Sequence, residues 1–208
     1  MVVVELFNSD GTRLTSAAVV ERTGERLNGN VYTLTLPVHS TLSFTLLGDS
    51  TTKVGWLKYR YVSSYTNPAF GGFAAIHGIF RQKLPGLPNL EAVVLPDWGL
   101  DDEIIAPFDN KNGFVTSMAL ANGSSYSNNK VKFEIYDETG TLISTYEKIF
   151  PVGRHMAFET YREWPETANQ RGTIKVISSG YGMATVSLLF NPTGSLTSSQ
   201  FYEFQPLN

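Results

Sequence analysis

Two stretches of the chain read almost alike: Val2–Thr15, VVVELFNSDGTRLT, and Val131–Ser144, VKFEIYDETGTLIS. In each, a run that alternates apolar and polar residues leads into a turn closed by a glycine, Gly11 or Gly140, and a second strand follows. The two stretches begin 129 residues apart. The sequence therefore predicts two copies of one β-hairpin.

The similarity continues beyond the hairpin, with a spacing that changes only gradually. The spacing falls from 129 to 114 because the first copy carries about fifteen extra residues around Ala17–Thr33. Similarity at a nearly fixed period indicates internal duplication. We therefore expect a first repeat over residues 1–97, a linker over 98–104 and a second repeat over 105–208. The matched residues include Leu36 and Phe150, Phe44 and Phe158, Gly55 and Gly172, Gly72 and Gly182, and Phe80 and Phe190.

Composition places the chain among folded proteins and limits its chemistry. Of 208 residues, 42% are hydrophobic and 17% charged, and Ser, Thr, Asn and Gly are abundant, a profile common in secreted β-rich proteins. The absence of cysteine excludes disulfides and thiolate metal sites. A net charge of −3 gives no electrostatic basis for nucleic-acid binding. No apolar run is long enough to cross a bilayer, and residues 1–11 do not resemble a signal peptide, so a secreted form requires that its leader has been removed.

The pattern along the chain is that of short strands separated by Gly, Pro and Asn turns. Val54–Val62 alternates strictly, which places Tyr59 and Tyr61 on the face opposite the charged side chains of this strand. Thr23–Asn30 is expected to be a polar loop, and Glu159–Thr167 fits a short helical turn. We predict an all-β protein of two tandem antiparallel, immunoglobulin-like β-sandwiches. A single barrel or jelly roll of about 200 residues is the alternative.

The two copies differ at their beginnings. A leading segment, Ile105–Asn122, precedes the hairpin of the second copy, whereas the first copy begins at the hairpin and lacks this strand. A sandwich without one strand has an open edge. Three explanations remain: the chain is cut from a longer array, another molecule donates the strand, or the insertion at Ala17–Thr33 fills the gap. We expect Val2–Phe7 and Gly71–Phe80 to lie near an open edge or groove.

Motifs for catalysis are missing from the sequence. There is no GxSxG elbow, no cysteine nucleophile and no phosphate-binding loop. His39, His77 and His155 occupy unrelated positions of the repeat and have no metal-ligand spacing, so we interpret them as isolated structural residues. We predict that the protein is not an enzyme and has no cofactor. Asn122 begins an Asn-Gly-Ser glycosylation sequence.

Two groups of side chains are candidate binding sites. Asp101, Asp102 and Glu103 belong to an acidic cluster near the linker that suits Ca²⁺, although a solvated linker explains the same pattern. The second group is aromatic and suits stacking on sugar rings, although half-buried core strands have the same pattern. Its members are Trp56, Tyr59, Tyr61 and Trp164.

The repeat contains a Gly-[Trp/Thr]-[Leu/Ile]-Lys strand at Gly55 and Gly172, and a Phe-Asn-Pro-x-Gly turn at Phe190–Gly194. With its Gly-x-Ala-x-[Ile/Val] strand, it resembles immunoglobulin-like β-sandwich modules of secreted bacterial proteins. The resemblance implies an extracellular or cell-surface, non-enzymatic protein with a structural or adhesive role and protein partners or self-association at sheet edges. A carbohydrate-binding module and a viral or phage structural protein are the alternatives.

Overall fold

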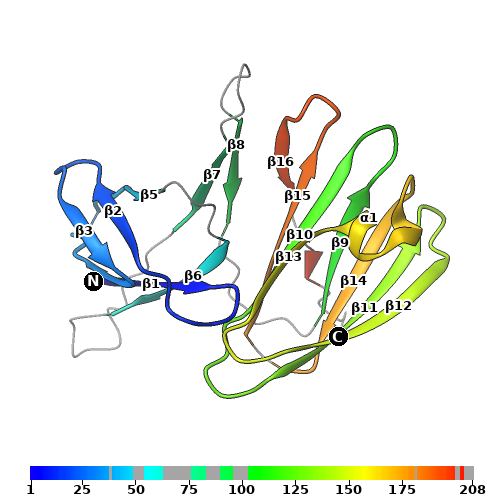
Figure 1. Cartoon of the computed structure of the whole chain (residues 1–208), viewed down its shortest axis with the longest axis horizontal. Helices are drawn as coiled ribbons and strands as arrows, with labels where there is room; N and C mark the ends of the chain where they lie inside the picture. Colours follow the sequence, from blue (N-terminus) through cyan, green and yellow to red (C-terminus); the bar gives the residue numbers. More distant parts are fainter. Residues whose placement is uncertain are drawn as a thin grey trace. The chain divides into compact units, whose positions relative to one another are not determined.

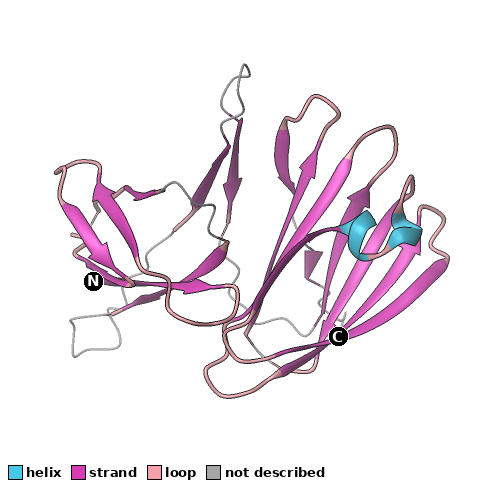
Figure 2. Ribbon diagram, in the orientation of Figure 1, coloured by secondary structure: helices cyan, strands magenta, loops and turns pink. Residues whose placement is uncertain are grey.

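The computed structural model describes residues 1–37, 39–48, 54–62, 76–82, 90–95, 103–180, 182–199 and 202–203. These residues form antiparallel β-sheets with a single short α-helix among them (Figure 2), so the predicted all-β class is confirmed. The chain divides into two compact units, Met1–Ala75 and Ile76–Asn208. Each unit has its own hydrophobic core.

The first unit contains two three-stranded sheets (Figure 1). In the order β4-β1-β6, the first sheet consists of β4 (Val31–Leu34), β1 (Val2–Asn8) and β6 (Gly55–Tyr61). The second, in the order β3-β2-β5, consists of β3 (Arg26–Gly29), β2 (Ser16–Val20) and β5 (Phe44–Leu47). Alternate residues of β1, among them Val4 and Leu6, are buried at 0% and 2% exposure and form the centre of this core.

The second unit contains a five-stranded sheet, a four-stranded sheet and a two-stranded one. In the order β12-β11-β14-β9-β17, the largest consists of β12 (Leu142–Phe150), β11 (Asn129–Asp137), β14 (Arg171–Ser178), β9 (Glu103–Asp109) and β17 (Tyr202–Glu203). In the order β13-β10-β15-β16, the next consists of β13 (His155–Glu159), β10 (Val115–Asn122), β15 (Met183–Phe190) and β16 (Leu196–Ser199). The third pairs β7 (Gly78–Gln82) with β8 (Leu90–Val94).

A short helical segment follows β13, where the sequence predicts a helical turn. The α-helix α1 spans Thr160–Glu163, and the 3-10 helix η2 spans Pro165–Thr167. Between them Trp164 enters the core of the second unit, which also contains Phe133, Ile135 and Ile174. The segment thus covers part of the core rather than extending a sheet.

The two predicted hairpins share one turn geometry. Gly11 and Gly140 have positive φ angles of 86° and 84°, which glycine adopts without the steric cost of a Cβ. Each glycine N–H donates to the carbonyl three residues earlier, that of Asn8 at 3.0 Å or of Asp137 at 3.1 Å. Both turns were therefore predictable from the glycine and its polar neighbours.

The central strands of the two units also pair in the same register. Gly55 of β6 lies opposite Asn8 of β1, and Gly172 of β14 lies opposite Asp137 of β11. These are the residues that the sequence comparison matches. Hence β6 occupies in its sheet the place that β14 occupies next to β11.

The chain after the first turn takes a different course in the two units. In the second, β12 continues along β11 to Phe150. In the first, a single bridge between Phe7 and Arg13 pairs the chain after the turn with β1. The chain then turns away from β1, forms β2 and β3, and pairs with β1 again as β4. The extra residues of the first copy form this excursion, and β2 pairs with β5. The loop expected at Thr23–Asn30 is thus wrong, because β3 lies within it.

Two further expectations concern edges and boundaries. Val2–Phe7 does not lie at an edge, because β1 is hydrogen-bonded to β4 on one side and to β6 on the other. Of Gly71–Phe80, residues 71–75 lie outside the described residues. Most of the predicted linker, 98–102, also lies outside them, and β9 begins at Glu103. The repeat boundaries stay a prediction, while β7 and β8 belong to the second compact unit.

Candidate functional site

The four predicted aromatic residues are not gathered on one surface. Tyr59 and Tyr61 share a face of β6, opposite Val4 and Val2 of β1, and Tyr59 packs against the core of the first unit. Trp56 lies on the other face of the same strand, opposite Phe7. Alternation correctly separates the tyrosines from Lys58 and Arg60, but it places Trp56 with the charged residues.

Trp56 belongs to a stack across the outer face of its sheet. Its ring lies parallel to that of Phe7, with centroids 4.5 Å apart and an interplanar angle of 13°. The guanidinium of Arg13 lies over the Phe7 ring at 4.5 Å and pairs with Glu5 at 2.7 Å. Phe7 is thus held by a π-stack and a cation–π contact. This stack gives Trp56 a structural role.

Trp164 is a core residue of the second unit. It is 1% exposed. The centroid of its ring lies 5.0 Å from the ring centroids of Phe133 and Phe158 and 6.0 Å from that of Tyr146. Stacking on a sugar requires an exposed ring face, which this conformation does not offer. Burial therefore favours the core interpretation of Trp164, and sugar binding by the aromatic set stays a prediction.

The calcium candidates are only partly described. Asp101 and Asp102 lie outside the described residues. Glu103, at the start of β9, pairs with Lys175 of β14 at 2.7 Å, so its carboxylate joins two neighbouring strands. Within the described ranges no three His, Asp or Glu side chains gather as metal ligands do.

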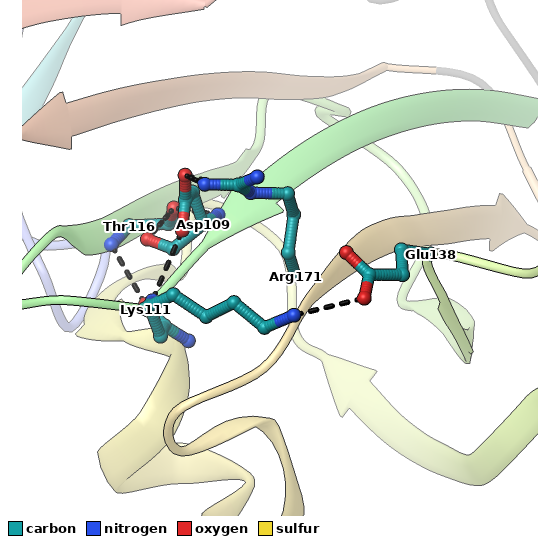
Figure 3. Close-up of polar contacts among 6 residues, drawn as sticks. Asp109, Lys111, Thr116, Glu138 and Arg171 are labelled. Carbon is teal, nitrogen blue, oxygen red and sulfur yellow. Dashed lines mark hydrogen bonds and ion pairs between the residues drawn. The ribbon is translucent and has the colours of Figure 1, made fainter.

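A polar cluster at one end of the five-stranded sheet joins three segments (Figure 3). Arg171 donates to a single carboxylate oxygen of Asp109 through Nε at 2.9 Å and Nη2 at 2.7 Å, which raises the pKa of the guanidinium further. The other Asp109 oxygen accepts from the backbone N–H of Lys111 at 3.0 Å, and the Lys111 ammonium pairs with Glu138 at 2.9 Å. Each charge has an opposite partner, so the cluster holds the β9–β10 turn against β14 and the β11–β12 turn.

A buried polar network lies beside this cluster. The side-chain amide of Asn110 donates to Thr160 at 2.9 Å and to the Thr167 carbonyl at 3.1 Å, and its oxygen accepts from the N–H of Thr116 at 2.9 Å. All four residues are buried. Buried polar groups are stable only when satisfied, so this network fixes α1 and η2 on the strands.

The edge of the five-stranded sheet at β12 carries an inward-facing charge. Lys148 lies opposite Val131, which is fully buried, and its ammonium pairs with Glu163 of α1. Nearby, the Tyr146 hydroxyl donates to Glu166 at 2.6 Å, and this bond raises the tyrosine pKa. Inward charges on an edge strand oppose the addition of another strand, because pairing would bury them. The β12 edge is thus protected.

The edge of β6 is built differently. In the part of the chain that the structure describes, β6 pairs with β1 alone. Its Leu57 faces the core side, opposite Leu6, yet is 43% exposed, and Val54 and Tyr61 along the same edge are 53% and 39% exposed. The sequence analysis inferred an open edge from the missing leading strand but expected it near Val2–Phe7 and Gly71–Phe80, and it did not single out β6. The signal for β6 was the match between Gly55 and Gly172, because a leading strand precedes the hairpin of the second copy alone.

Asn122 and His155, which the sequence analysis considered as a glycosylation site and as an isolated structural residue, are both at least partly buried. Asn122 is fully buried, and its amide nitrogen donates to the carbonyls of Ser127 at 3.0 Å and Phe150 at 2.9 Å, so the folded chain hides the nitrogen that a glycan would modify. His155, in β13, has its pKa lowered by burial. His39 lies in a turn, and His77 precedes β7.

Comparisons with models of protein families, with curated proteins and with solved structures found no match. Among the described residues, no helix has both the length and the apolar character needed to cross a membrane. The chain's own geometry is therefore the basis for proposing a function.

Proposed function

We propose that the chain consists of two β-sandwich units that arose by duplication, as in the immunoglobulin-like modules that the sequence resembles. Three features support a common origin. The two hairpin turns have the same geometry, and β1 pairs with β6 in the register in which β11 pairs with β14. On its other side each of these central strands has a second neighbour, which is β4 for β1 and β12 for β11, with Val2 opposite Leu34 and Val131 opposite Lys148. The duplicated strands correspond without a slip.

We further propose that the protein is a non-enzymatic structural or adhesive protein, outside the cell, that assembles through a sheet edge. The observation that carries this proposal is the β6 edge, where Leu57 on the core side is 43% exposed. An open edge that presents apolar side chains is a template for strand pairing. The inward charge that protects β12 has no counterpart at Leu57, so the two edges differ in their readiness to pair.

The proposal assigns structural roles to the polar groups described above. The pairs Asp109–Arg171, Lys148–Glu163 and Lys175–Glu103 each bridge separate segments of the second unit. Such pairs position strands rather than substrates. A sugar-binding role for Trp56 is the weaker alternative because Phe7 already stacks on its ring.

The proposal is tested by light scattering of the whole chain across roughly a hundredfold range of concentration, with and without Leu57→Lys. We expect a mass that rises above 23.0 kDa with concentration and a loss of this rise in the variant. Ile149→Lys, at a 69% exposed position of β12, is the matched control and is expected to behave as the parent chain. A constant monomer mass together with turnover on an ester or polysaccharide panel would contradict the proposal.

A further inference from the structure

We propose that one end of the second unit is a loop tip that contacts a lipid surface. The loop tip consists of residues 123–128, between β10 and β11, and residues 151–154, between β12 and β13. Its central residue is Tyr126, which enters the interfacial region of a bilayer. This inference goes beyond the proposed assembly function and does not depend on the β6 edge.

Tyr126 protrudes from a loop whose backbone is held by local hydrogen bonds. Its side chain is 96% exposed, the largest value among the large hydrophobic side chains that the structure describes. The backbone N–H groups of Tyr126 and Ser127 both donate to the Ser124 hydroxyl, each at 3.2 Å. These bonds order the backbone around Ser124, while the ring of Tyr126 extends into solvent.

The buried side chain of Asn122 anchors this loop at both ends. Its oxygen accepts from the N–H of Ser124 at 3.0 Å, and its nitrogen donates to the carbonyls of Ser127 at 3.0 Å and Phe150 at 2.9 Å. A loop that is already ordered loses less conformational freedom when it binds. The Asn-Gly-Ser sequence therefore serves to present Tyr126.

The turn between β12 and β13 adds apolar surface beside this loop. The N–H of Val152 donates to the side-chain oxygen of Asn128 at 3.2 Å, and the N–H of Gly153 donates to the carbonyl of Asn122 at 3.0 Å. Val152 is 42% exposed, and Pro151 before it is exposed as well. The loop tip thus combines one aromatic ring with two aliphatic side chains.

The charges around the loop tip suit a lipid headgroup region. Residues 121–129, ANGSSYSNN, carry no charged side chain, so the loop enters the interface without burying a charge. Arg154, exposed at the end of the second turn, offers a cation for the phosphate groups of lipids. Tyrosine suits the interface itself, because its ring is apolar and its hydroxyl stays hydrated.

The small size of the loop tip favours a bilayer over a protein partner. A buried aromatic side chain contributes about 150–250 Å², whereas a stable protein interface takes about 800 Å² from each partner. A fluid bilayer adapts to a small convex surface, but a protein partner needs a larger matched one. A sugar site would need further side chains around the ring, and a ring that is 96% exposed has none against it.

The probes are vesicles of phosphatidylcholine alone and of phosphatidylcholine mixed with phosphatidylserine, sedimented with the whole chain. We expect binding to both, stronger with the anionic lipid because of Arg154. Tyr126→Ala should weaken binding about tenfold, because it removes the ring that the interface buries. Tyr126→Trp should retain binding and add fluorescence that is quenched by lipids brominated in their acyl chains. Leu142→Ala, at a 50% exposed position at the other end of β12, is the matched control and should bind as the parent does.

Three results would overturn the inference. They are no sedimentation with either kind of vesicle, equal binding of Tyr126→Ala and the parent chain, and fluorescence of Tyr126→Trp that brominated lipids leave unchanged. Binding to anionic vesicles alone would also overturn it, because charge rather than the ring would then carry the contact. Leu57→Lys should bind vesicles as the parent does, so a failure of edge assembly and a failure of lipid contact are told apart.

Discussion

Substitution of Gly172 by alanine tests the close approach of the central strands. A Cβ at this position would lie 1.9 Å from the carbonyl oxygen of Tyr136 and 2.9 Å from its carbon. Both atoms are backbone, so no side-chain rotation relieves the clash, and β14 must move away from β11. The matched Gly55→Ala variant of the first unit would place its Cβ 2.1 Å from the carbonyl oxygen of Phe7. The matching register of β6 and β14 predicts the same defect in both units.

We estimate the cost from two effects. Overpacking of a rigid contact costs about 1–3 kcal/mol, and each ladder hydrogen bond lost adds roughly 1 kcal/mol, so about 3 kcal/mol is expected. Gly48→Ala is the control, since its Cβ would meet nothing within 4 Å, and we expect it to change stability by less than about 0.5 kcal/mol.

The assay is urea unfolding of each variant, followed at Trp56 for the first unit and at Trp164 for the second, in a background in which Trp98 is replaced by Phe. Gly55→Ala should shift the first transition and Gly172→Ala the second. The reasoning is refuted if Gly172→Ala unfolds at the same urea concentration as Gly48→Ala. It is also refuted if only one of the two glycines is sensitive, because the shared register then has no shared consequence.

Three further predictions concern the second unit. The Asp137 pKa is lowered, first by the Thr139 hydroxyl and then by backbone N–H groups, so its stabilising effect is present above the unfolded pKa and is lost as pH falls through the folded one. Asp137→Asn should therefore flatten the acid limb of a pH-stability curve; an unchanged slope contradicts this. Trp164→Ala should cost about 3–5 kcal/mol in urea unfolding, and a cost under about 1 kcal/mol would place the ring at the surface. Lys148→Leu should increase association in light scattering, because it removes the inward charge from the β12 edge; an unchanged monomer contradicts this.

Local features of the fold were predictable from the sequence. Gly11 and Gly140 marked both turns because a positive φ favours glycine, and the strand alternation correctly separated Tyr59 and Tyr61 from the charged face of β6. The leading segment expected before the second hairpin is present and forms the strands β9 and β10. These features depend on neighbouring residues along the chain.

Pairing partners were not predictable in the same way. Alternation shows which face of a strand is buried but not which strand lies beside it. Val2–Phe7 was therefore expected near an open edge or groove, although β4 and β6 flank β1. The polar loop expected at Thr23–Asn30 contains β3, because pairing with β2 outweighs a weak strand propensity. For Trp164 the sequence left both a core and a binding interpretation open, because the residue lies between two short helical segments, where strand alternation does not indicate which side is buried.

Hydrogen exchange of the free chain tests the central claim, that the β6 edge is open, most directly. The experiment compares the amides of β6 that point away from β1 with the matching amides of β14, which point towards β9. The account predicts faster exchange in β6 than in β14, because the β14 amides are hydrogen-bonded to β9, whereas among the described residues β6 pairs with β1 alone. Equal protection in the two strands of a monomeric sample would contradict it, because the edge would then already be covered by the chain itself.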